Sequence, residues 1–279
     1  MNIINKKAIN ELKQKLNLEY DIDILAVRGS EANSYTILMD DIILEHQNES
    51  TSSMNDVFIV PVEDLVIAFK GSTFPNQNYI DSNEKVNLLM NGFYTHYSKG
   101  IHNKGTNTEH TALRQTRNQP VLRTFNKETN SFDISGIVDY CNAHDNIHAG
   151  WCKDSNQAYY ESKGCQVIMG YPQCPKRKRA EGQWKTFISV IESIDKQLFN
   201  YLVIPFRWLN LQNDLCIFGS RGEKVEFLQR LLGISQDGIF GKDTLFAVID
   251  FQKKNNLTVD GVAGNNTFEI LKMKTGIRK

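Results

Sequence analysis

The sequence predicts an α+β fold, in which a mainly β region with helical additions is followed by a small all-α region. Short apolar runs with the period-two alternation of half-buried strands recur between residues 22 and 204. Apolar residues at helical spacing follow from Val225 onward. In that second region Asp-Gly-x-x-Gly occurs twice, at 237–241 and at 260–264, which indicates two equivalent turns. We therefore expect two domains, at residues 1–209 and 210–279.

The elements of the first domain follow from its apolar patterns. The segment 71–91 is rich in Ser, Asn and Pro and is expected to be a long loop. A turn at 30–34 is expected to join the first two strands as a hairpin. In chain order the expected elements are a helix at 6–18, strands at 22–26, 35–39, 41–45, 57–60, 65–69, 92–97 and 121–125, a helix at 182–194 and a strand at 199–204.

Helices of the second domain are predicted by two apolar series. Val225, Leu228 and Leu231 form one series, and Leu245, Val248 and Phe251 form the other. Each Asp-Gly-x-x-Gly turn places glycine where a positive φ suits it. The threonine after each turn, Thr244 and Thr267, is expected at a helix start.

The amino-acid composition limits the classes of partner that the protein is expected to bind. Among 279 residues, 32 Lys and Arg balance 32 Asp and Glu, so no excess of positive charge indicates nucleic acid. The basic run 176–179 is expected to be a solvated loop or a local contact with an anionic polymer. No apolar stretch is long enough to span a bilayer, so membrane insertion is not expected.

One histidine and one cysteine indicate thiol chemistry. His148 follows a predicted strand, and Cys165 lies 17 residues later in the turn Ser162-Lys163-Gly164-Cys165, which leads into apolar residues. A cysteine nucleophile needs a base within hydrogen-bond reach of its sulfur and backbone N–H groups directed at the developing oxyanion. A histidine on a strand facing a Gly-Cys turn can supply both.

This spacing resembles the signature of L,D-transpeptidases of the YkuD type, in which His-Gly precedes Ser-x-Gly-Cys-(Ile/Val)-Arg by a similar distance. Segments 97–102, 112–115, 146–148 and 164–168 resemble phage- and prophage-type relatives of that fold. The resemblance covers residues 57–205, and residues 1–56 have no family assignment. Gln166 stands where the signature has arginine, which puts the substrate contact at that position in doubt.

Residues 219–272 resemble a peptidoglycan-binding domain of the three-helix type. The resemblance is carried by Val225 to Gln229, by the two Asp-Gly-x-x-Gly turns and by the Phe251-Gln252 pair between them. Together the two resemblances imply a cysteine enzyme that acts on peptidoglycan and is held on the wall by its second domain. A wall-bound module raises the local concentration of substrate.

The resemblance implies a role for each residue of the site. Cys165 is expected to attack a stem-peptide carbonyl, and His148 to act as the base and then protonate the leaving amine. The N–H groups of Gly164 and Cys165 are candidates for the oxyanion hole, and Ser162 is expected to orient the turn or bond to the histidine. The expected substrate-binding residues are Gln166, His102, Tyr97 and Arg114. No cofactor or metal is expected, and hydrolysis and transfer to an amine both remain open.

Structural rather than catalytic roles are expected for several residues near these positions in the sequence. His96, His110 and His144 are expected to be solvent or packing residues, and Asp145 a turn residue. Five cysteines, an odd number, leave at least one thiol unpaired, while a disulfide between Cys152 and Cys174 remains open.

Two alternatives belong to other classes. A zinc peptidase with His96, His102, Asp145 and His148 as ligands would act on the same polymer, although no helical His-x3-His supports it. A structural protein that only docks on the wall would need the second domain alone.

The N-terminal residues lack an apolar signal core, so we expect synthesis in the cytoplasm without a Sec address. The expected site of action is the periplasm or wall of a target cell, reached as an antibacterial effector or a phage lysin. An effector would need an immunity protein as a partner.

Overall fold

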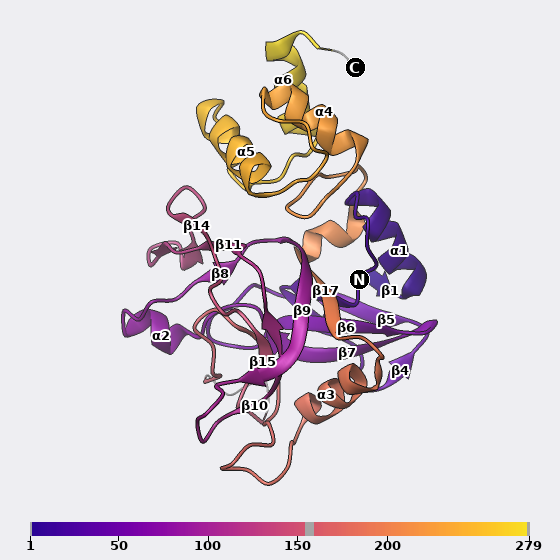
Figure 1. The fold of residues 1–279 in the computed structure, drawn as a ribbon, viewed down its shortest axis with the longest axis vertical. Helices are drawn as coiled ribbons and strands as arrows, with labels where there is room; N and C mark the ends of the chain where they lie inside the picture. Colours follow the sequence, from indigo (N-terminus) through magenta and orange to yellow (C-terminus); the bar gives the residue numbers. More distant parts are fainter. Residues whose placement is uncertain (1, 154–158, 278–279) are drawn as a thin grey trace.

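The chain forms a mainly β region followed by a bundle of three C-terminal helices (Figure 1). The computed structural model describes residues 2–153 and 159–277. No helix among these residues is long and apolar enough to cross a membrane. The helices are α1 (Lys6–Lys15), α2 (Gln77–Asp81), α3 (Gln183–Ser193), α4 (Glu223–Leu232), α5 (Lys242–Lys254) and α6 (Asn265–Thr275), and a 3-10 helix spans Phe206–Asn210.

Within the described residues, seventeen strands form four sheets. The first eight are β1 (Asn2–Ile4), β2 (Ile24–Arg28), β3 (Ser30–Ala32), β4 (Leu38–Met39), β5 (Ile42–His46), β6 (Asp56–Val62), β7 (Leu65–Ser72) and β8 (Leu88–Leu89). The others are β9 (Gly92–His102), β10 (His110–Gln115), β11 (Gln119–Leu122), β12 (Phe125–Asn126), β13 (Ser131–Phe132), β14 (Val138–Cys141), β15 (Ile147–Ala149), β16 (Gln166–Ile168) and β17 (Leu198–Pro205).

The largest sheet closes on itself. Its nine strands run in the order β16-β15-β10-β9-β17-β2-β6-β7-β4, and β16 also pairs with β7. Eight strands therefore form a ring, and β4 extends from β7. Only the β15–β16 and β17–β2 pairs are parallel. The smaller sheets are β1-β5-β3, β14-β11-β8 and β12-β13.

The ring has an apolar core on each face. Phe58, Phe69 and Tyr201 are among the interior side chains, and α3 adds Trp184 and Phe187 to that interior core. Alternate residues of the same strands face the other way. Leu25 and Val27 of β2, for example, pack with α1 and the β1-β5-β3 sheet. This alternation decides which residues of each strand are available to a ligand.

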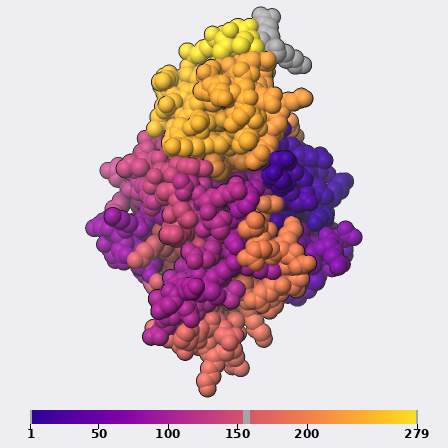
Figure 2. Space-filling view, in the orientation of Figure 1, coloured from indigo at the N-terminus to yellow at the C-terminus, as the bar shows by residue number. Residues whose placement is uncertain are grey.

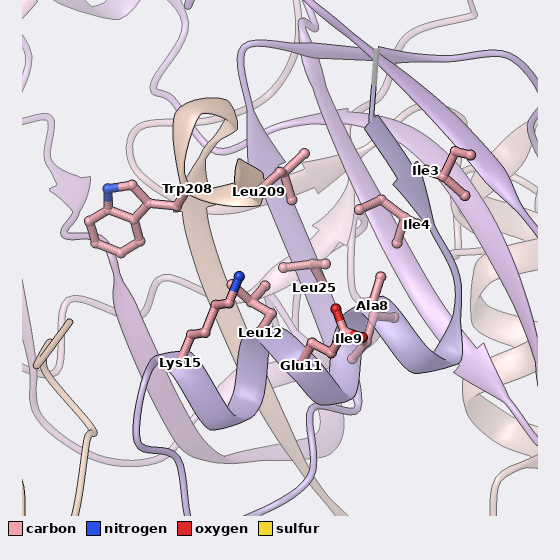
Figure 3. A pocket seen from close by; sticks show the side chains of 10 residues that line it. All are labelled: Ile3, Ile4, Ala8, Ile9, Glu11, Leu12, Lys15, Leu25, Trp208 and Leu209. Carbon is pink, nitrogen blue, oxygen red and sulfur yellow. The ribbon is translucent and has the colours of Figure 1, made fainter. Parts of the chain in front are cut away.

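The N-terminal residues, which carry no family resemblance, are part of the second core. Asn5 caps α1, because its side-chain oxygen accepts a hydrogen bond from Ala8 N (2.8 Å). Leu12 and Ile9 of α1 face Leu25 and the 3-10 helix residues Trp208 and Leu209 around a hollow of about 50 Å³ (Figure 3). A hollow of this size does not admit a peptide or a sugar.

Most expected elements of the first domain form, with four differences. Residues 30–34 are no hairpin turn, because β3 pairs with β5 and leaves β2 to pair with β6 and β17. The expected strand 35–39 is reduced to β4, and the strand expected at 121–125 lies at β11 instead. The expected loop 71–91 contains α2 and β8, which its polar composition conceals.

The C-terminal helices repeat one hydrogen-bond pattern. Gln229 Nε2 donates to Asp237 Oδ1 (2.6 Å), to Ile239 O (3.1 Å) and to Thr244 Oγ1 (3.0 Å), and Gln229 Oε1 accepts from Gly238 N (2.9 Å). Gln252 forms the same bonds, 23 residues later, with Asp260, Val262, Thr267 and Gly261.

Thr244 and Thr267 lie in the first turns of α5 and α6, which begin at Lys242 and Asn265, so the prediction of threonine at each helix start is confirmed. Each threonine hydroxyl also belongs to the glutamine network of its repeat.

The three-helix bundle is fused to the β region rather than tethered to it. Phe74, Leu88, Met90 and Leu122 of the first region share one apolar core with α4, α5 and α6. Arg221 N donates to Asn17 O (2.7 Å), and Ser220 Oγ donates to Leu16 O (2.6 Å). In the space-filling view the bundle, orange to yellow, lies directly on the magenta and indigo regions (Figure 2). The two regions thus hold a fixed relative position.

Truncation after Asn210 tests this fusion. It uncovers Phe74, Leu88, Met90 and Leu122, and each such side chain contributes about 1.5–3 kcal/mol when fully buried. We expect the fragment to melt at least roughly 10 °C below the full chain and to bind a hydrophobic dye. Differential scanning calorimetry measures this, and an unchanged melting temperature would show two independent domains.

The glutamine networks make a second stability prediction. Gln229→Met keeps the side-chain volume but leaves the Gly238 N–H without its partner and removes the bonds to Asp237 and Thr244. We expect a loss of about 2–4 kcal/mol in the free energy of unfolding, measured with urea. Gln252→Met is expected to cost a similar amount, and the exposed Gln212→Met almost nothing. Equal effects at Gln212 and Gln229 would contradict the networks.

Candidate active site

Cys165 and His148 lie on neighbouring strands and face the same side. β15 and β16 are parallel, with His148 in register with Val167. Ile147, Ala149 and Ile168 point into the ring, so His148 and Val167 point outward. Cys165, two residues before Val167 and packed in the same small apolar cluster, shares that outer face. The structure thus places the predicted nucleophile and base on one face, and in the described residues their side chains bond to other groups, His144 O and Ala149 O, rather than to each other.

His148 is held as a neutral imidazole by its surroundings. Its Nδ1 is 2.8 Å from Ala149 O, and this atom must donate because a carbonyl only accepts. The tautomer with Nδ1–H leaves Nε2 as the basic nitrogen. The ring is 2% exposed and stacks on His102, with 4.2 Å between centroids. Burial, followed by the charges of His102 and His110, lowers the pKa of His148 well below its usual value.

Cys165 is a half-buried thiol at the entrance to β16. Its Sγ donates to His144 O at 3.3 Å. Burial, and next the nearby Asp145 carboxylate, raises the pKa of Cys165 well above its usual value. No hydrogen bond between the Cys165 and His148 side chains occurs in the described part of the chain. The resting group is therefore a protonated thiol and not a thiolate paired with imidazolium.

Ser162 and Gly164 shape the turn before the cysteine. Ser162 Oγ donates to Cys165 O (2.7 Å) and accepts from Gly164 N (3.2 Å), so Ser162 orients the turn and bonds to no histidine in the described residues. Gly164 has φ +155°, and a Cβ there would lie 2.3 Å from Asn87 Nδ2. Gly164 N–H already has an acceptor in Ser162 Oγ, so Cys165 N–H remains the candidate of the predicted pair for an oxyanion hole.

Gln166 and Tyr97 point into the ring and are not available to a substrate. Gln166 Nε2 donates to Gly164 O (2.9 Å), and Gln166 Oε1 accepts from Tyr201 (3.0 Å). The Tyr97 hydroxyl donates to Asp145 O (3.0 Å). Both side chains are fully buried. The substrate contacts predicted for them do not fit this geometry. Gln166 faces inward because it is adjacent to the outward Cys165, and Tyr97 belongs to the interior core.

His102 and Arg114 lie on the outer face of the ring, where His102 stacks on His148. His102 Nδ1 is 2.9 Å from Asn146 Nδ2, and burial with the charges of His110 and Arg114 lowers the pKa of His102 to about 4. The Arg114 side chain covers Gly100, which pairs with Ala112.

The sequence analysis missed a buried polar chain behind the turn. Asn87 Nδ2 donates to Asp145 Oδ2 (2.6 Å), and Arg123 Nη1 donates to Asn87 Oδ1 (3.1 Å). Burial raises the pKa of Asp145 to about 7, against the effects of Asn87 and Arg123. His110, expected to be a solvent or packing residue, also belongs to the site, because its ring contacts those of His102 and His148.

The zinc alternative is not supported by the arrangement of its proposed ligands. His96 bonds to the neighbouring Thr95 Oγ1, and Asp145 bonds to Asn87. His102 and His148 stack face to face instead of converging their nitrogens. Within residues 2–153 and 159–277, no three His, Cys, Asp or Glu side chains are placed to hold a metal ion.

Two of the remaining cysteines lie near the site. Cys152 belongs with Met54 and Tyr160 to the apolar cluster against which Cys165 packs, and Cys141 Sγ lies 3.2 Å from Arg123 Nη2. Cys174 forms a backbone bridge with Arg177. No disulfide joins Cys152 to Cys174.

Comparison with known families assigns the C-terminal region. Residues 210–271 match the family of peptidoglycan-binding domains. The chain therefore carries a peptidoglycan-binding domain. The match includes both glutamine networks and the helices α4 to α6 almost to their end. No solved structure matches the chain.

The Asp145 carboxylate provides a test of the electrostatics around Cys165. Above pH 7 this group is ionised and disfavours the thiolate, so Asp145→Asn should lower the pKa of Cys165. We expect alkylation of Cys165 by iodoacetamide at pH 8–9 to become about 3- to 10-fold faster. The rate is measured by mass spectrometry of the Cys165 peptide.

Asp133→Asn, at an exposed loop carboxylate, is the matched control and should leave the rate unchanged. A rate that does not change in Asp145→Asn either would mean that Asp145 does not act on the thiol.

Proposed function

We propose that the protein is a peptidoglycan-directed thiol enzyme that cleaves or exchanges a stem-peptide bond through Cys165. The observation that carries the proposal is the placement of a half-buried thiol and a histidine with a basic Nε2 on one outer face of two adjacent parallel strands. The peptidoglycan-binding domain supplies the substrate class.

The reaction begins with transfer of the thiol proton to His148 Nε2. The Cys165 sulfur then forms a bond to the carbonyl carbon of a stem peptide, and the oxyanion is stabilised by Cys165 N–H. Collapse breaks the C–N bond, and the proton on His148 goes to the leaving amine. Water or another amine then attacks the thioester, which releases the acyl group and returns the proton to sulfur.

The pKa shifts of Cys165 and His148 indicate that the proton transfer occurs only after substrate has bound. Both partners are neutral at rest, because burial raises the pKa of the thiol and lowers that of the imidazole. Bonds between catalytic groups commonly form only once substrate is bound. Binding at this face must displace the Cys165 thiol from His144 O and direct it toward His148.

Docking on the wall without chemistry is the second candidate. It is favoured by the hydrogen bond from Cys165 to a backbone carbonyl and by the absence, in the described residues, of a bond to His148. The peptidoglycan-binding domain is sufficient for this role.

The biological setting that we propose is attack on the wall of a target cell, as an antibacterial effector or as a phage lysin. The wall-binding domain fits both settings. In the effector setting, an immunity protein would act by covering the face that carries Cys165.

Substitution of the nucleophile separates the two candidates. Purified sacculi are incubated with wild type, with Cys165→Ala and with Cys174→Ala, a half-buried cysteine on another loop. After muramidase digestion, we expect mass spectrometry to show lost stem residues, lost crosslinks or exchanged amino acids with wild type and Cys174→Ala. Cys165→Ala should be at least about 1,000-fold slower.

Identical muropeptides in all three samples, with binding to sacculi retained, would establish docking alone. Equal activity in wild type and Cys165→Ala would refute the thiol mechanism, and loss of that activity with a chelator would restore the zinc alternative.

A further inference from the structure

A groove of about 530 Å³ lies beside the Cys165 turn and shares Arg123 with the polar chain behind that turn. One wall is the segment 83–86, which follows α2. The other wall contains Arg123, Phe125 and Lys127, at and just beyond the end of β11. Lys127 Nζ donates to Asn83 Oδ1 (3.2 Å) across the groove.

Successive contacts connect this groove to the nucleophile. Lys163 of the turn forms an ion pair with Glu84. Asn87 N donates to Lys163 O (2.9 Å), and the Asn87 side chain packs directly on Gly164. Arg123 in turn donates to Asn87 Oδ1. A ligand in the groove is therefore separated from Cys165 by the Asn87 side chain and one glycine.

The groove is cationic. Lys85, Arg123 and Lys127 line it with a single acidic residue, Glu84, whose carboxylate is paired with Lys163 outside the lining. Both lysines are exposed. The apolar side chains of Ile80, Val86 and Phe125 complete the lining, so the groove suits an anionic group attached to an aliphatic chain.

Arg123 is held in a fixed orientation within the lining. Its Nε and Nη2 donate to Asp139 Oδ2 (3.3 and 3.2 Å), Nη2 also lies 3.2 Å from Cys141 Sγ, and Nη1 donates to Asn87. These contacts use four of the five guanidinium N–H groups and leave one on Nη1. The side chain is 29% exposed, so that donor is pre-organised for an acceptor in the groove.

We propose that this groove is the subsite for a carboxylate of the stem peptide that Cys165 attacks. The inference rests on the proposed function and names its substrate contact. Gln166 cannot make that contact, because it is buried inside the ring. Arg123, Lys85 and Lys127 thus select stem peptides with free carboxylates over amidated ones.

Direct binding tests the groove independently of catalysis. All proteins carry Cys165→Ala, and isothermal titration calorimetry uses two soluble stem peptides, one with free carboxylates and the same peptide amidated. Lys85→Met with Lys127→Met is the main variant, since exposed lysines can be replaced without loss of the fold. The control is Lys176→Met with Lys178→Met. It makes the same change of charge at two exposed lysines that do not line the groove.

We expect the unmodified groove to bind the free peptide at least about 10-fold more tightly than the amidated one. The groove variant should lose that difference, and the loop variant should keep it. Arg123→Gln should lose it as well, with folding verified by its melting temperature. Equal affinities for both peptides, or a preference that survives in the groove variant, would overturn the inference.

Turnover of sacculi by the protein with Cys165 intact separates this result from the proposed function. A carboxylate preference without turnover would leave the groove as a peptide-binding site and refute the enzyme. Turnover without a carboxylate preference would leave the enzyme and refute the groove.

Discussion

The strand ring closes where β16 lies against β7, and this closure depends on Gly71 having no side chain. Val167 and Ile168 pair with Ser72 and Gly71, and a Cβ at Gly71 would lie 2.2 Å from Val167 O. No side chain could fit there without moving one of the two strands. Because Cys165 is at the entrance to β16, this close approach acts together with the β15–β16 pairing and the bonds of the turn to position the thiol.

The closure also explains which parts of the site a sequence can reveal. The spacing of His148 and Cys165 predicted that the histidine faces the Gly-Cys turn, and the alternation of buried residues places both residues on the outer face of the ring. That same alternation could have shown Gln166 to be an inward residue, had the outward orientation of Cys165 been applied to its neighbours. Asn87 and Arg123 carried no such signal, because they reach the turn from a polar loop and from a separate small sheet.

Fold prediction succeeded for elements that a local sequence pattern determines. It failed for elements that form only by pairing with a strand distant in the sequence. The helices α1 and α3 and the β6–β7 hairpin follow from apolar periodicity within one segment. β3 forms because it pairs with β5 at the edge of a small sheet. No pattern within Ser30–Ala32 itself predicts this pairing. In the second domain the two turns were found from sequence. The buried Gln229 and Gln252 that hold them were visible only as part of the family resemblance.

The fusion of the two regions through one apolar core has a geometric consequence. A module on a flexible linker lets its enzyme sweep a volume around each anchoring point. Here Met90 and Leu122 are packed among the helices of the wall-binding domain, so the vector from that domain to Cys165 has a fixed length and direction. For the proposed thiol chemistry, this rigidity implies that a protein anchored on peptidoglycan would reach only those stem peptides that project at one distance and one rotation from the anchor.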